Sequence, residues 1–83
     1  MPHQLELPPE TATDIIRNHI RDVSDATYRY GNAGLAILLG DKALSGIARE
    51  IGEMASQGNL ASLRGKCDKY RKLAVQKMER FSS

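Results

Sequence analysis

His19 and Asp22 have the residue types and the spacing that could support chemistry. Three positions apart on a helix, they lie on one face, where an imidazole and a carboxylate could share a proton or bind a metal ion together. A protein metal site takes three or four ligands, and the sequence has one further histidine, His3. We therefore predict no metal site and expect no cofactor.

A phosphoryl group is the other chemistry that His19 could carry. The neighbouring Asp22 carboxylate would repel that group, because both are negatively charged. The sequence also has no G-x-S-x-G nucleophile motif and no glycine-rich phosphate loop with a lysine. We expect a protein that is not an enzyme and has no catalytic residues.

Cys67 is the single cysteine, and it lies on an apolar helical stripe, where cysteine acts as a small hydrophobic residue. A single cysteine forms no internal disulfide, which favours a reducing compartment. The longest apolar run, Leu35 to Leu39, is far shorter than the roughly 18 residues of a membrane span, and the first ten residues lack the regions of a signal peptide. We expect a cytoplasmic protein with no membrane partner.

Basic residues gather near the end of the chain. Residues 59–83 hold seven lysines and arginines against two acids, whereas residues 1–58 hold five against eight. This asymmetry favours a protein partner with an acidic surface, or nucleic acid, for the last helix. The candidate contact residues either flank its apolar stripe or point outward, and they are Arg64, Lys66, Lys69, Arg71 and Lys72.

Three interpretations of this basic face stay open. It could bind an acidic protein surface, or it could neutralise several phosphates of a nucleic acid in a salt-sensitive manner. It could also be a solvated helix face, partly paired with Glu50 and Glu53. No aromatic residue interleaves the basic ones outside the apolar stripe, so stacking on single-stranded bases has no support.

The stretch IAREIGEMASQGNL, residues 47–60, bears on this choice. Its beginning resembles the first half of a helix-turn-helix, and a degenerate motif over residues 47–72 would make the basic helix a DNA reader. The distance from Gly52 to Leu60 is long for such a turn, and the apolar helical spacing continues beyond Gly52. The pattern favours a plain turn between two helices, with Gly58 as the stop and Asn59 as the next cap.

Helical periodicity predicts the first element over about residues 11–30, after an extended N-terminal tail at residues 1–9. Thr11 or Thr13 would be its N-cap, with Asp14 in the first turn, where the helix dipole favours an acid. Gly31-Asn32 would end it. Its apolar stripe comprises Ile16, Ile20, Val23, Thr27 and Tyr30.

The second and third helices are predicted over about residues 33–57 and 60–80. Gly40-Asp41 could break the second helix, but we expect one long helix, kinked there at most, with an interior glycine that costs ~1 kcal/mol. Gly46 and Gly52 would allow a neighbouring helix to approach closely. The third helix has the most regular stripe, made of Leu60, Leu63, Cys67, Tyr70, Ala74, Met78 and Phe81.

These elements predict one all-α domain over residues 10–82, an antiparallel hairpin or bundle of three helices, or of four if Gly40-Asp41 breaks the second. A chain of 83 residues buries only about 60% of its surface, so we expect a homodimer that completes the core. The predicted function is that of a small regulatory or adaptor protein that presents its basic last helix to a protein partner. A small DNA-binding regulator is the alternative.

Overall fold

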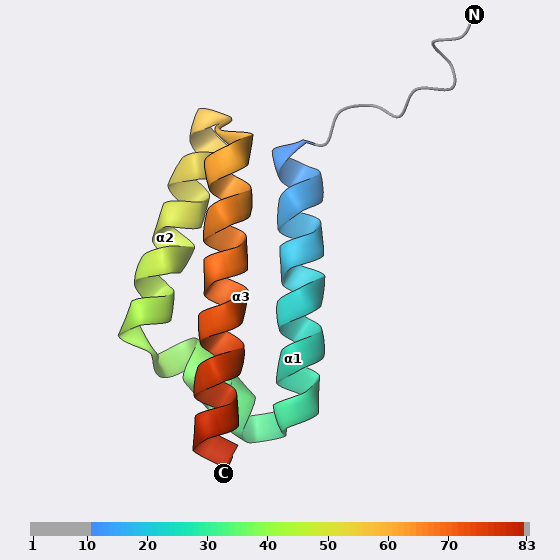
Figure 1. Cartoon of the computed structure of the whole chain (residues 1–83), viewed down its shortest axis with the longest axis vertical. Coiled ribbons are helices and arrows are strands. Elements are labelled where there is room, and N and C mark those ends of the chain that lie inside the picture. Colours follow the sequence, from blue (N-terminus) through green and yellow to red (C-terminus); the bar gives the residue numbers. More distant parts are fainter. Residues whose placement is uncertain (1–10, 83) are drawn as a thin grey trace, which may run out of the picture.

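The computed structural model describes residues 11–82, which form three helices and, within that range, no strand. Figure 1 shows α1 (Ala12–Gly40), α2 (Lys42–Gln57) and α3 (Leu60–Ser82). The predicted all-α class is confirmed for these residues. The predicted tail at residues 1–9 lies outside the described residues.

α1 begins with a reciprocal pair of hydrogen bonds. Asp14 N–H donates to Thr11 Oγ1 at 3.3 Å, and Thr11 N–H donates to Asp14 Oδ2 at 3.2 Å. This capping box satisfies backbone amides that the first turn of a helix leaves without partners. Thr11, one of the two predicted caps, is therefore the N-cap.

A kink at Gly31 divides α1 into two parts. Gly31 has φ 64° and ψ −140°, in the region that favours glycine because it has no side chain. The helix resumes after it, and residues 32–40 turn toward α2 (Figure 1). The predicted break at Gly31-Asn32 takes the form of this kink.

The chain breaks a second time at Gly40-Asp41, so the predicted continuous helix over residues 33–57 is wrong. Asp41 has an extended backbone, and its Oδ1 accepts a hydrogen bond from Leu44 N–H at 3.0 Å, which makes it the N-cap of α2. Its Oδ2 accepts from Lys77 Nζ at 2.7 Å. This bond from a distant part of the chain holds the cap in place. Between residues 11 and 82 the structure thus has three helices, of which the first is kinked at Gly31 and ends at Gly40, where the alternative prediction placed a break.

The turn between α2 and α3 agrees with the prediction. Gly58 ends α2 with φ 71° in the left-handed region, and its N–H donates to Ala55 O at 3.2 Å. Asn59 Oδ1 then accepts from Ser62 N–H at 3.2 Å, as an N-cap does. Gly52 lies inside α2, five residues before its end.

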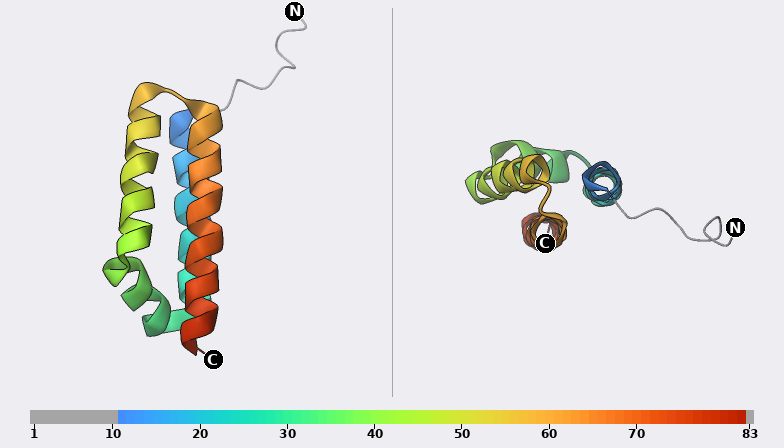
Figure 2. Two further views of the ribbon diagram at one scale, coloured as in Figure 1. Left: turned by 60° about the vertical axis from the view of Figure 1, so that its left-hand side comes forward. Right: turned by 90° about the horizontal axis from the view of Figure 1, so that it is seen from above.

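The core gathers around α3, which packs along both other helices, while α1 and α2 touch each other much less. Figure 2 shows the same arrangement from above, with α1 and α2 separated and α3 beside both. The predicted stripe of α3 is buried from Leu63 to Met78, but Phe81 is 66% exposed beyond the end of the packed region. The buried hydrophobic residues are Ile15, Ala26, Leu44, Ile47, Ile51, Leu63, Cys67, Tyr70, Ala74 and Met78.

The predicted stripe of α1 is only partly buried. Ile20, at its centre, is 58% exposed, whereas Ile15 and Ala26, outside that stripe, are buried. The buried face is therefore rotated from the predicted one. The cause is that the first part of α1 packs mainly against one helix, α3, and needs only a narrow contact face.

The glycines of α2 do not mediate helix packing within the chain. A Cβ atom at Gly46 or at Gly52 would meet nothing within 4 Å, so the expected close approach does not occur there. Close packing occurs instead at Gly34, where a Cβ atom would lie 3.2 Å from Tyr30 Cβ and 3.3 Å from Met78 Sδ. Gly34 thus allows residues 32–40 to lie against α3.

None of the helices between residues 11 and 82 combines the length and the apolar character that crossing a bilayer requires.

Candidate interaction surface on the last helix

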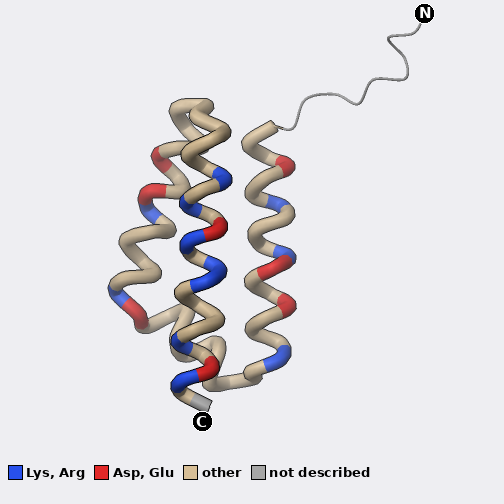
Figure 3. Tube along the Cα trace, viewed as in Figure 1, with Lys and Arg blue, Asp and Glu red and all other residues tan. Residues whose placement is uncertain are grey.

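The five predicted contact residues of α3 lie on three different sides of it. Lys69 and Lys72 are exposed, whereas Lys66 and Arg71 are partly buried. Lys66 faces α2 and pairs with it, while Arg64 and Arg71 line the space between α1 and α3. Figure 3 shows Lys and Arg positions crowded along the middle of α3, with an acidic position among them. The five residues do not form one continuous patch.

Lys66 forms an ion pair with α2. Its Nζ lies 3.1 Å from Glu50 Oε1, and both side chains are partly exposed. The pairing with Glu50 that the solvated-face interpretation predicted is therefore present. An exposed pair of this kind stabilises a fold little, by ~0–1 kcal/mol. It also makes Lys66 less available to a partner.

Asp68 neutralises part of the outward face of α3. Its carboxylate accepts from Arg71 Nη2 at 2.7 Å and lies 3.0 Å from Lys72 Nζ. The hydrogen bonds from Lys72 and Arg71 lower the pKa of Asp68 below its ordinary value, so the carboxylate is charged at neutral pH. Two of the five predicted cations thus share one internal counter-ion.

Lys69 differs from these residues, because it makes no ion pair within the part of the chain that the structure describes. It is exposed and borders two adjoining hollows, one between α2 and α3 and one lined by α3 alone. Leu73, half-buried, lines both hollows with it. Lys69 is therefore the predicted residue best placed to meet a partner.

The two hollows share Lys69 and Leu73, and we call the hollow between the two helices, together with its extension over the outward face of α3, the α2–α3 groove. The larger has a volume of about 600 Å³ and the other about 410 Å³, and both are open to solvent. Ile47 and Leu73 give the groove an apolar floor. The α2 side contributes Lys42, Ala43, Gly46, Arg49, Glu50 and Glu53, and the α3 side Gly65, Asp68, Lys69, Lys72 and Gln76.

Sequence reasoning missed the contribution of α2 to this surface. Lys42 and Arg49 lie seven residues apart, which is close to two helical turns, so both point to the same side of α2. That spacing was a usable signal. The spacing identifies a surface shared with α3 only when it is known which face of α2 packs against α3.

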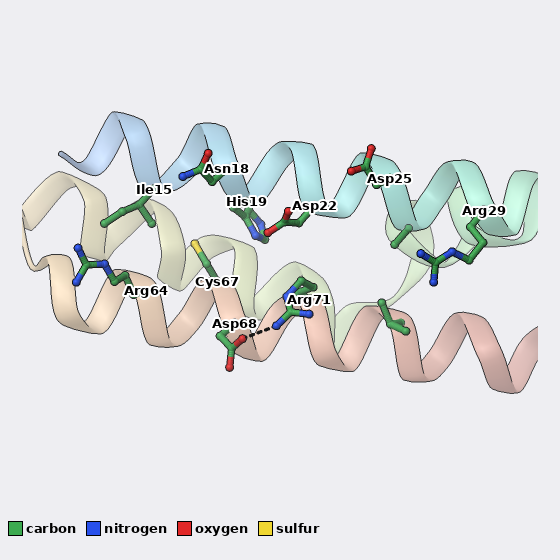
Figure 4. Close-up of a pocket in the computed structure, with 12 residues that line it drawn as sticks. Ile15, Asn18, His19, Asp22, Asp25, Arg29, Arg64, Cys67, Asp68 and Arg71 are labelled. Atoms are coloured by element: carbon green, nitrogen blue, oxygen red, sulfur yellow. Dashed lines mark hydrogen bonds and ion pairs between the residues drawn. The ribbon is translucent and has the colours of Figure 1, made fainter. Parts of the chain in front are cut away.

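A second groove, between α1 and α3, contains His19 and Cys67 (Figure 4). It has a volume of about 550 Å³ and mixes both signs of charge: three arginines and three aspartates line it. His19 and Cys67 point into it from opposite helices in Figure 4. The lining charges are Asp22, Asp25, Arg29, Arg64, Asp68 and Arg71.

His19 packs against α3 in this groove. Its ring lies 5.1 Å from the Tyr70 ring, measured between centroids, at an interplanar angle of 82°, an edge-on aromatic contact. Burial lowers the pKa of His19 below its ordinary value, and the nearby Asp22 carboxylate opposes this effect. The His19 ring thus contributes to the packing of α1 on α3.

Cys67 is 8% exposed and belongs to the core, as predicted. Burial raises the pKa of its thiol, so the thiolate that would react or bind metal is disfavoured. Between residues 11 and 82, no group of three or more His, Cys, Asp or Glu side chains converges to hold a metal ion.

Comparison with known proteins gives no identification. No family model, no curated protein and no solved structure matches this chain.

Proposed function

We propose that this protein is a small non-enzymatic adaptor or regulatory protein that binds an acidic protein surface through the outward face of α3. One observation carries the proposal: Lys69 is exposed beside the half-buried Leu73 and has no internal counter-ion among the described residues. A charged side chain next to apolar surface is typical of protein interfaces, where apolar contact supplies affinity and charge supplies specificity.

The pairing of the other cations favours a protein partner over DNA. Lys66, Arg71 and Lys72 each lie within ion-pair distance of a carboxylate of this chain. Asp68 lies among them and would repel the phosphates of a nucleic acid. On the outward face of α3, Lys69 and Lys72 are the candidate contacts, whereas Arg64, Lys66 and Arg71, the other three predicted residues, lie on its sides toward α1 and α2.

The DNA-binding alternative is tested directly by fluorescence anisotropy with a labelled mixed-sequence duplex, at low and at physiological salt. We expect no saturable binding at low salt, where charge attraction is screened least. Micromolar binding that collapses with added salt, and that weakens again when Arg64, Lys66 and Lys69 become Gln, would instead establish phosphate contacts and overturn the adaptor proposal.

We further propose that two copies pair and complete an antiparallel bundle. The support is that Ile20 is 58% exposed on α1 and that α1 and α2 contact each other much less than each contacts α3. Sedimentation equilibrium tests this, with Ile20→Glu as the interface variant and Arg21→Glu as its neighbour control. We expect a dimer that only Ile20→Glu dissociates. A monomer at millimolar concentration contradicts pairing.

A further inference from the structure

The part of the α2–α3 groove between the two helices is open to solvent and has a volume of about 600 Å³. Two helices that lie side by side leave a depression between them, into which a further helix packs with an axis separation of roughly 8–10 Å. Gly46 lines the depression from α2, and Gly65 lies on α3 in the adjoining hollow. A Cβ atom at Gly46 or at Gly65 would meet nothing within 4 Å, so no side chain between residues 11 and 82 fills the space directly above either residue. A partner backbone can therefore approach the apolar floor closely.

The charged residues of the groove indicate which kind of partner surface it can bind. Lys42 and Arg49 stand on the α2 side and Lys69 on the α3 side, and none of the three makes an ion pair among the described residues. The α2 side also carries two acids: Glu50 is paired with Lys66, and Glu53 lies toward the C-terminal end of α2. Cations therefore border an apolar floor on both sides, and the complementary surface is apolar in the middle with acids on both flanks.

We propose that the α2–α3 groove binds an acidic amphipathic helix of a partner protein, with an apolar stripe on Ile47 and Leu73 and glutamates or aspartates facing Arg49 and Lys69. This rests on the proposed adaptor function and specifies the form of the partner. A helix lying in an apolar groove presents side chains at every third or fourth position to it. Glu53, toward the C-terminal end of α2, makes an uncharged or basic residue favourable at that end of the bound helix.

A protein helix suits this groove better than a nucleic acid does. Nucleic acid binding depends on many phosphate contacts, whereas this groove offers few uncompensated cations and includes Glu53 and Asp68. The apolar floor of Ile47 and Leu73 would meet no apolar counterpart on a phosphate backbone.

The test uses the full chain and a synthetic, fluorescein-labelled helical peptide of about five turns, with a leucine stripe and glutamates on both flanks. A matched peptide carries Gln in place of each Glu. We expect micromolar binding of the Glu peptide by anisotropy and at least roughly tenfold weaker binding of the Gln peptide. In two-dimensional amide NMR spectra, the Gly46 and Gly65 signals should shift with the Glu peptide, while Gly31, at the α1 kink, should not.

Protein variants locate the site. We expect Arg49→Glu and Lys69→Glu each to weaken binding of the Glu peptide roughly tenfold, whereas the same charge change at Arg21 on α1 alters it less than about twofold. Gly46→Trp should fill the groove and weaken binding roughly tenfold, while Gly46→Ala leaves it within about twofold. Circular dichroism of each variant shows that its helices are intact.

The outcomes separate this inference from the adaptor proposal. If Lys69→Glu weakens binding but Arg49→Glu and Gly46→Trp do not, the contact is on α3 alone: the adaptor proposal stands and the groove is excluded. If the Glu peptide binds no better than the Gln peptide, or shifts only signals around the α1–α3 groove, the inference is overturned. If a DNA duplex binds and the peptide does not, both proposals fail.

Discussion

Lys77 and Asp41 join two points of the chain that are 36 positions apart. Lys77 Nζ, on α3, donates to Asp41 Oδ2 at 2.7 Å, and the same carboxylate accepts from Leu44 N–H at the start of α2. The hydrogen bond from Lys77, followed by that from Leu44, lowers the pKa of Asp41 below its ordinary value of 3.8. The N-terminus of α2 is thereby tied to α3 by a charged contact.

This contact makes part of the stability depend on acid pH. A depressed carboxyl pKa contributes stability that is fully present above the ordinary value of 3.8 and is lost as pH falls toward and below the lowered value. We expect Lys77→Met to lower the Tm at neutral pH, and the difference from the unmodified protein to shrink below about pH 4. Circular dichroism melts over a pH series measure this. Lys69→Met, which removes a cation that has no ion pair among the described residues, should show no such convergence.

His19 should give a second pH dependence nearer to neutrality. Burial lowers its pKa from the ordinary value of 6.5, so the unfolded chain binds a proton more readily than the folded chain does. The free energy of unfolding should therefore fall as pH drops below 6.5 toward the lowered pKa. The Asp22 carboxylate on α1 opposes this effect, and Arg71 and Asp68 are the charged groups of α3 that line the same groove. His19→Phe keeps a ring beside Tyr70 and should remove this slope. Urea midpoints on both sides of the ordinary pKa measure it, and an unchanged slope would show that other groups cause it.

Two glycine substitutions should have different effects. Gly46→Ala places a methyl group in open space on a helix, so the free energy of unfolding should rise by up to about 1 kcal/mol. Gly34→Ala must accommodate a methyl group 3.2 Å from Tyr30 Cβ and 3.3 Å from Met78 Sδ, so its stability should be clearly below that of Gly46→Ala. Chemical denaturation of both variants makes the comparison. Equal gains would mean that residues 32–40 do not pack closely on α3.

Substitutions in the middle of the apolar stripe of α3 should destabilise the fold much more than substitutions at its C-terminal end. Leu63 is completely buried, so Leu63→Ala should cost about 2–5 kcal/mol. Phe81, on the same stripe, is 66% exposed, and Phe81→Ala should cost less than about 1 kcal/mol. Urea unfolding followed by circular dichroism gives both values. A large loss at Phe81 would indicate that a second copy covers this end.

Local patterns predicted the elements, but not how they are rotated and joined. The stripe of α3 and the Gly58–Asn59 turn depend on nearby residues, and both are observed as predicted. The break at Gly40-Asp41 was missed because its stabilising partner, Lys77, is distant in sequence. The exposure of Ile20 was missed because a helix with apolar residues on two adjoining faces can pack through either one.

For the candidate site too, local spacing predicted some features, while others depend on how the helices pack. Helical spacing alone placed Lys69 and Lys72 on the outward side of α3. The counter-ion role of Asp68 for Lys72 and Arg71 follows from the side-chain rotamers that all three adopt. The residues that α2 contributes to the groove can be predicted only when it is known which face of α2 packs against α3. The packing of Leu44, Ile47 and Ile51 decides that face.

We expect the kink at Gly31 to separate two parts of the molecule that resist local unfolding to different degrees. The part of α1 before Gly31 contributes only Ile15 and Ala26 to the buried core, whereas α2 and α3 share most of it. Rotation about one unobstructed glycine can release this part while the Asp41–Lys77 contact and the Gly58 turn stay formed. Its backbone amides should therefore exchange with deuterium sooner than those of α2 and α3, as a separate, low-free-energy opening of the native state.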